Sequence, residues 1–109
     1  MVGFKFKKNK TMSVVKRNIS DEGKGEFFIE RDEHKISRLE IIIKANEIWA
    51  IHTEVEAAFE GQGLAGELFT ELVDFTRAHR LRLVPRCPYI LTKLKRHPEQ
   101  FTDIWKGAS

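Results

Sequence analysis

The stretch EGQGLAGELFTELVDF, residues 60–75, decides the fold because it joins a glycine-rich loop to an amphipathic segment. Gly61, Gly63 and Gly66 spell G-x-G-x-x-G, a pattern that holds phosphate groups when a strand precedes it and a helix follows. Apolar residues then recur at three- and four-residue spacing: Leu64, Leu68, Phe69, Leu72 and Phe75. The stretch therefore predicts a helix over residues 63–79 that begins at a loop suited to an anion.

The sequence on either side of this stretch is typical of a sheet. Three segments rich in Phe, Ile, Trp and Val precede it: EFFIE (26–30), RLEIII (38–43) and EIWAIHTEV (47–55). Their short polar connections imply antiparallel hairpins. After the helix, LRLV (81–84) indicates a buried strand, and prolines frame a second helix over 88–96. We therefore expect an α/β (α+β) fold, a mixed, mostly antiparallel sheet of about four or five strands with two main helices.

The length of the chain suits a single domain. Its 109 residues leave no room for a second core. Residues 1–11 carry four lysines and no apolar periodicity, so we expect a flexible basic tail ahead of one domain at 12–109. No apolar run approaches the roughly 20 residues that cross a bilayer, and no signal-peptide pattern follows the N-terminus. The single cysteine, Cys87, fits a reducing, cytoplasmic setting.

Positive charge is concentrated in two blocks. Residues 1–17 carry six Lys or Arg and no acid, residues 77–98 carry seven and no acid, and residues 18–74 carry fourteen acids against five bases. Such blocks are commonly solvated surface, but they also suit an anionic ligand. Nucleic acid is the general candidate, although no recognised nucleic-acid-binding motif is present. A smaller anion suffices for the second block, which follows the glycine helix.

The glycine pattern alone does not identify the ligand. A dinucleotide-binding Rossmann unit needs a strand that enters the first glycine directly and a carboxylate near the end of the next strand. Here EAAFE separates Val55 from Gly61, and the next strand ends in VPR. No Gly-Lys-Ser/Thr follows, which excludes a Walker P-loop. On the motif alone, glycines that only let the helix pack closely remain an open alternative.

The wider stretch from 51 to 99 resembles a small subfamily of the GNAT acyltransferase superfamily, compact single-domain proteins that bind acetyl-CoA. Its markers are HTEV at 52–55, G-x-G-L-A at 61–65, CPY at 87–89 and RHPE at 96–99, in that order and spacing. The resemblance implies a GNAT-like sheet in a reduced form that lacks the first helix pair of larger members. It also implies acetyl-CoA or coenzyme A as cofactor, and no metal.

The resemblance assigns contacts to that cofactor. In GNAT proteins the turn R/Q-x-x-G-x-G/A presents backbone N–H groups to the pyrophosphate, and the helix dipole adds to the attraction. Glu60 departs from this pattern, and its carboxylate weakens the attraction unless nearby bases offset it. The assigned cofactor-binding residues are Val55, Gly61, Gln62, Gly63, Leu64, Ala65, Gly66, Lys93 and Arg96. Further bases expected near the 3′-phosphate are Arg82, Arg86 and Lys95.

The resemblance also implies where the acyl group lies. The strand before the loop and the next parallel strand splay apart, and the backbone N–H at Val55 polarises the thioester carbonyl. His52 and Glu54 share one strand face, placed as a base or a proton relay, and ordinary surface placement stays open as the alternative. The absent helix pair leaves the acceptor side open. Leu94 stands where larger members often carry a Tyr that protonates the departing thiolate.

Cys87 is the third catalytic candidate. It lies just before Pro88 at the start of the second helix and beside Arg86, and both surroundings favour the thiolate and a lowered thiol pKa. By the resemblance, Cys87 accepts the acetyl group or orients the cofactor's sulfur. A small buried hydrophobe is the alternative reading.

These expectations combine into one function. We expect an acetyl-CoA-binding GNAT-like N-acetyltransferase that acts on an unidentified amine, thiol or protein acceptor and has no membrane partner. A non-catalytic acyl-CoA-binding or sensor module is the alternative, followed by a nucleic-acid-binding domain.

Overall fold

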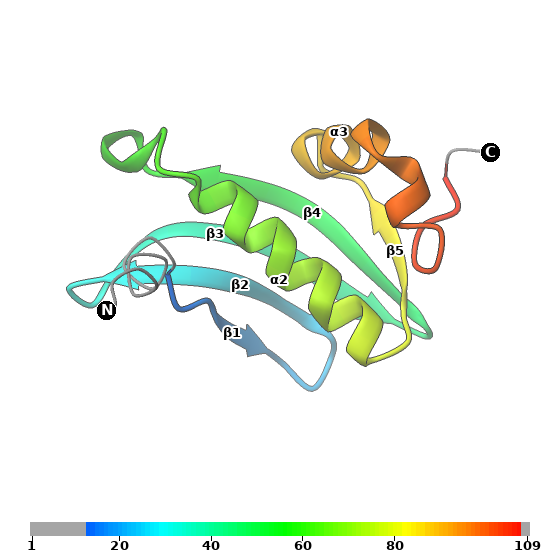
Figure 1. Cartoon of the computed structure of the whole chain (residues 1–109). Coiled ribbons are helices and arrows are strands. Elements are labelled where there is room, and N and C mark those ends of the chain that lie inside the picture. The colour runs from blue at the N-terminus through cyan, green and yellow to red at the C-terminus, as the bar shows by residue number, and fades with distance from the viewer. Residues whose placement is uncertain (1–12, 108–109) are drawn as a thin grey trace, which may run out of the picture.

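The computed structural model describes residues 13–107, which form one five-stranded sheet with helices packed against it (Figure 1). The strands are β1 (Lys16–Ile19), β2 (Lys24–Arg31), β3 (His34–Lys44), β4 (Glu47–Val55) and β5 (Arg82–Pro85). They lie in the order β1-β2-β3-β4-β5, and every neighbouring pair is antiparallel except β4 and β5, which are parallel. The chain crosses between these two strands through a helix.

Two-residue turns close the β2–β3 and β3–β4 hairpins. Asp32 and Glu33 have φ of 55° and 64°, the positive values that a type I′ hairpin turn requires at both positions. In the second turn Ala45 has φ of 55°. The antiparallel hairpins predicted from the short connections are therefore confirmed.

The helix α2 (Leu64–Ala78) covers the middle of the sheet. Its buried face consists of Leu64, Leu68, Phe69, Leu72, Val73, Phe75 and Thr76. These side chains join one core with alternate residues of the strands, among them Phe27, Leu39 and Ile41. Figure 1 shows α2 lying along this face of the sheet.

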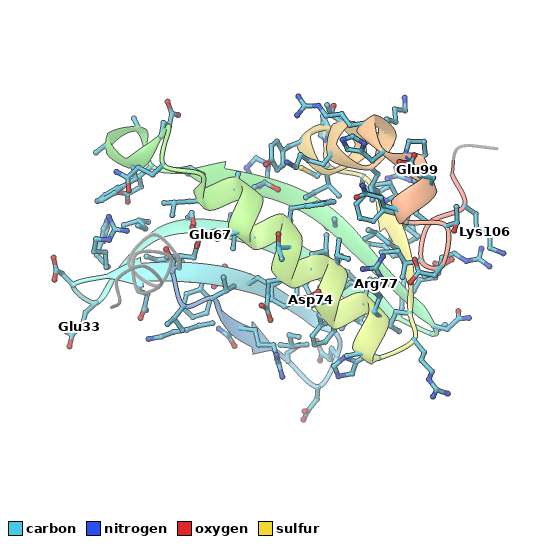
Figure 2. All side chains as sticks on the ribbon, viewed as in Figure 1. Glu33, Glu67, Asp74, Arg77, Glu99 and Lys106 are labelled. Carbon is cyan, nitrogen blue, oxygen red and sulfur yellow. The ribbon has the colours of Figure 1, made fainter. Side chains whose placement is uncertain are left out.

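The chain after β5 packs beside α2. It forms α3 (Pro88–Arg96) and the 3-10 helix η2 (Pro98–Gln100). Phe101 meets Phe69 of α2 edge-on, with ring centroids 5.6 Å apart. Arg77 of α2 donates hydrogen bonds to Asp103 at 2.8 Å and to the Gln100 carbonyl at 2.7 Å, and Figure 2 shows Arg77 near this segment. These contacts hold α3 and the segment after it on the same face as α2.

The other face of the sheet carries charged side chains, and no helix of residues 13–107 covers it. Arg38 of β3 lies 3.5 Å from Glu26 and 3.5 Å from Glu54. A solvated face of this kind is common in antiparallel sheets. The first helix pair of larger members was predicted to be absent, and only a turn joins β1 to β2 in this structure.

The predicted fold class is confirmed, but β3 begins four residues before the predicted segment 38–43 and β2 begins two residues before 26–30. The helix α3 spans the predicted residues, α2 is one residue shorter at each end, and β5 is shifted by one residue. The sequence did not resolve β1 as a separate strand, nor the 3-10 helix η1 (Ala57–Phe59) inside EAAFE. The predicted tail at residues 1–11 lies outside the described residues. Within residues 13–107, no helix is long and apolar enough to cross a bilayer.

Candidate functional site

A gap between β4 and β5 forms the centre of the candidate site. The two strands pair only from Glu47 with Arg82 to Ala50 with Pro85. The carbonyl of Ala50 then accepts hydrogen bonds from the backbone N–H groups of Arg86 and Cys87, both at 2.9 Å. Beyond Ala50, β4 runs on to Val55 beside β3 alone, as the resemblance implied for the splayed strands.

The glycine loop lies just beyond the end of β4. Gly61 and Gly63 have φ of 85° and 80°, in the left-handed region that favours glycine. Gly63 is the N-cap of α2, and its carbonyl accepts the first helical hydrogen bond from Glu67. Among residues 13–107, none accepts a hydrogen bond from the backbone N–H groups of residues 61–66. A row of unpaired donors at the positive end of a helix is suited to an anion.

Open space surrounds these glycines. A Cβ placed on Gly61 or on Gly63 meets no atom within 4 Å, so tight packing of the loop does not explain either residue. Their positive φ and the exposed loop amides are the features that require glycine. This observation disfavours the alternative in which the glycines serve close packing alone.

A cavity of about 360 Å³ joins the loop to the end of β4. Its lining residues are Thr53, Glu54, Val55, Phe59, Glu60, Gly61, Gly63, Leu64, Ala65, Gly66 and Tyr89. Tyr89, from the start of α3, faces the first turn of α2, with its hydroxyl 3.9 Å from the place of a Gly66 Cβ. Burial raises the pKa of Tyr89, so its hydroxyl stays protonated and able to donate at neutral pH.

Two predicted bases lie on the helix that carries Tyr89, although neither lines the cavity. The ammonium of Lys93 is 5.6 Å from the ring centroid of Phe69, on the α2 side of α3. Arg96 is close enough to Tyr89 for its charge to oppose the rise in the tyrosine pKa. Lys93 and Arg96 follow Tyr89 by four and seven residues on α3, so the three side chains share one face of that helix.

Two other bases that were expected near the 3′-phosphate, Arg82 and Arg86, lie away from the cavity. Arg82 begins β5 and pairs with Glu47, at the strand end remote from the glycine loop. The guanidinium carbon of Arg86 lies 5.4 Å from the ring centroid of Trp49. Trp49 alternates with the fully buried Ala50, so its side chain lies on the solvated face of the sheet. Because Arg86 packs against Trp49, its side chain lies away from the face of the sheet that α2 and α3 cover, which we call the helix face.

His52 and Glu54 lie together on the solvated face. His52 Nε2 is 3.6 Å from a Glu54 carboxylate oxygen, and Arg38 Nε is 3.5 Å from the other. The pairing of β3 with β4 contains a β-bulge here. Glu40 pairs with His52 while the next residue, Ile41, pairs with Ala50, so β4 has one extra residue between these pairs. Both side chains are about half exposed, which is compatible with contact to an incoming substrate.

Cys87 lies on the other side of the sheet. It is the N-cap of α3, is 3% exposed and belongs to the core. Its sulfur lies 3.3 Å from the hydroxyl of Thr53, whose partner in register is the buried Leu39. The three predicted catalytic residues thus divide into a pair on the solvated face and a buried thiol on the helix face.

Thr53, Phe59 and Tyr89 line the cavity but were not predicted to do so. Alternation along β4 places Thr53 on the same face as Val55, and that signal was available in the sequence. Tyr89 belongs to the CPY marker, to which the sequence assigned no contact, and Phe59 lies in a segment without a periodic pattern. In residues 13–107 no group of three His, Cys, Asp or Glu is placed to hold a metal ion.

Comparisons with known proteins identify the family of the chain and support its fold. A model of the family described as GCN5-related N-acetyl-transferase matches residues 26–104. A search of curated protein sequences finds no match. A GCN5-like protein from Staphylococcus aureus, solved by NMR, superposes with a TM-score of 0.63 at 21% identity, over 88% of this chain and 92% of that one.

Two larger acetyltransferases share the fold. The ribosomal-protein-S18-alanine N-acetyltransferase from Escherichia coli has a TM-score of 0.54 at 17% identity, over 59% of this chain and 42% of that one. The ribosomal-protein-alanine N-acetyltransferase from Brucella melitensis has a TM-score of 0.56 at 17% identity, over 75% of this chain and 65% of that one. At these identities the likeness concerns the fold.

Proposed function

We propose, from the premise that this chain belongs to the GCN5-related N-acetyltransferase family, that it binds acetyl-CoA and transfers the acetyl group to an acceptor amine. One observation carries the proposal most directly: the cavity at the end of β4 opens onto a loop whose backbone N–H groups have no partner within the described residues. The buried side chain of Cys87 is a free thiol, which fits a reducing, cytoplasmic location for the protein.

The residues of the loop fit the pyrophosphate of coenzyme A. The N–H groups of residues 61–66 would hold its oxygens, and the open space beside Gly61 and Gly63 leaves room for them. Lys93 and Arg96 would add positive charge from α3 and offset the carboxylate of Glu60. When bound, the cofactor supplies an activated acetyl group as a thioester.

Val55 and Tyr89 would place the acyl arm along the cavity. The backbone N–H of Val55 stands at the end of β4, where a donor polarises the thioester carbonyl. The hydroxyl of Tyr89, protonated at neutral pH, lies on the opposite wall.

Acetyl transfer would then use residues from both faces of the sheet. Cys87 would act as the nucleophile that takes the acetyl group from the cofactor's thioester, its sulfur replacing the cofactor's sulfur, which would take a proton from solvent. The acceptor amine would enter at the gap where β4 and β5 no longer pair, which borders both faces of the sheet, and would displace Cys87 from the acetyl group. His52, oriented by Glu54, takes the proton that the amine loses.

A non-catalytic acyl-CoA-binding module is the second candidate. Leu94, aligned with the usual leaving-group acid, is fully buried and supplies no proton donor. Titration calorimetry with acetyl-CoA tests the shared binding step, and release of free thiol in the presence of a panel of amines tests turnover. Binding with amine-dependent thiol release supports the enzyme, binding without release supports the module, and absence of binding contradicts both.

A further inference from the structure

One polar contact bridges the gap between β4 and α3. The Thr53 hydroxyl oxygen lies 3.3 Å from the Cys87 sulfur, although the two residues are 34 positions apart in the sequence. Thr53 belongs to the part of β4 that extends past the last pairing with β5, and Cys87 is the N-cap of α3. Thr53 also lines the cavity. The contact therefore connects the buried sulfur to the cavity wall.

Within the described residues this contact is the one hydrogen bond of the Cys87 side chain. The N-terminus of α3 has no side-chain cap, so the sulfur is not held by the helix amides. The position of the sulfur therefore depends on the Thr53 hydroxyl that faces it.

The chemistry of threonine suits both protonation states of a thiol. A hydroxyl rotates freely and either accepts a hydrogen bond from S–H or donates one to the thiolate. The β-branched side chain restricts χ1, so the oxygen stays in place while its hydrogen turns. Valine has nearly the same shape as threonine but no hydroxyl, so it forms a hydrogen bond with neither the thiol nor the thiolate.

We propose that Thr53 is a positioning residue that holds the Cys87 sulfur beside the cavity and supplies the hydrogen bond that its thiolate needs. This inference rests on the proposed function, in which Cys87 takes the acetyl group. Thr53 acts through Cys87 and does not itself react.

The test compares alkylation of Cys87 by iodoacetamide in the folded protein without coenzyme A. Cys87 is the one cysteine of the sequence, so the signal is unambiguous. Thr53→Val removes the hydroxyl and keeps the shape, while Thr53→Ser keeps the hydroxyl. Thr76→Val is the matched control, because the Thr76 hydroxyl is buried and donates to the Leu72 carbonyl at 2.6 Å in another part of the core.

We expect Thr53→Val to slow alkylation by about 2- to 10-fold, the effect of one net hydrogen bond. Thr53→Ser should restore the rate, and Thr76→Val should leave it unchanged. The S–H stretching band in the infrared should move to higher frequency in Thr53→Val alone, because the thiol there loses its acceptor.

Three results overturn the inference. If Cys87 is alkylated as fast in Thr53→Val as in the wild type, the hydroxyl of Thr53 has no role. Thr53→Ser remaining as slow as Thr53→Val assigns the effect to packing. A wild-type thiol that reacts neither with iodoacetamide nor with acetyl-CoA shows that no reactive sulfur is positioned. Calorimetry with coenzyme A on the wild type separates these results from failure of the proposed function, which would appear as absence of binding.

Discussion

Replacing Gly63 with Asp tests whether the loop binds phosphate. Gly63 is the N-cap of α2 with φ of 80°, and a Cβ there meets no atom within 4 Å, so the new side chain enters without a clash. The remaining cost is the left-handed backbone, about 1 kcal/mol of unfolding free energy, and Asp and Asn adopt that conformation more readily than most residues. We therefore expect a folded variant with a slightly lower melting temperature.

The loss of affinity is expected to come mainly from charge. Two like charges 4 Å apart repel by about 1 kcal/mol in water and by about 4 kcal/mol at an effective dielectric constant of 20. An Asp in open space beside the two charges of a diphosphate lies nearer the first value, which gives about 2 to 3 kcal/mol in total. That energy corresponds to about 30- to 150-fold weaker binding of coenzyme A.

Titration calorimetry with coenzyme A measures this loss, and Gly63→Asn is the matched control. Asn has the size and backbone tolerance of Asp without its charge, so the difference between the two variants isolates the electrostatic part. Added salt should narrow that difference. A folded Gly63→Asp variant that binds coenzyme A as tightly as the wild type would refute the reasoning.

Three further predictions concern charged groups. Glu60→Arg should bind coenzyme A as tightly as the wild type or up to about 10-fold more tightly in the same calorimetric assay, and weaker binding would reveal a contact of Glu60 that the account lacks. Asp103→Asn should lower the unfolding free energy by about 0.5 kcal/mol in denaturant titrations at neutral pH, since the pair with Arg77 is exposed. The hydrogen bond from Arg77 lowers the pKa of Asp103, so this stabilisation is present above the unfolded value of about 3.9 and is lost as pH falls through the lower folded value; a difference that persists in strong acid would contradict it. His52→Gln should slow acetyl transfer by about 100-fold or more in a thiol-release assay while leaving the melting curve unchanged, and an unchanged rate would remove His52 from the mechanism.

The elements that the sequence predicted well are those specified by local signals. Pro88 at the first position of α3 and the leucines of α2 fix these helices through short-range patterns. Short polar connections likewise specified the hairpins. The strand β1 was harder to recognise, because it is an edge strand of four residues with a largely exposed pattern.

Site features that depend on register and packing were harder to predict. The contact of Thr53 with Cys87 requires the end of the β4–β5 pairing and the start of α3 to meet in space. Arg86 was expected near the cofactor because of its place in the sequence, but the ring of Trp49 holds its guanidinium on the solvated face. Adjacent residues of an extended chain point to opposite sides, so proximity in sequence was a poor guide there.

The central claim is that the amides of the glycine loop hold the pyrophosphate of coenzyme A. Amide chemical shifts recorded during titration of the labelled protein with coenzyme A test it most directly. We expect the largest shifts on residues 61–66 and smaller ones along β4 to Val55, and we expect pantetheine without phosphates to leave the loop amides unmoved. Binding of coenzyme A with its shifts clustered on the solvated face around Arg38, and none on the loop, would contradict the claim.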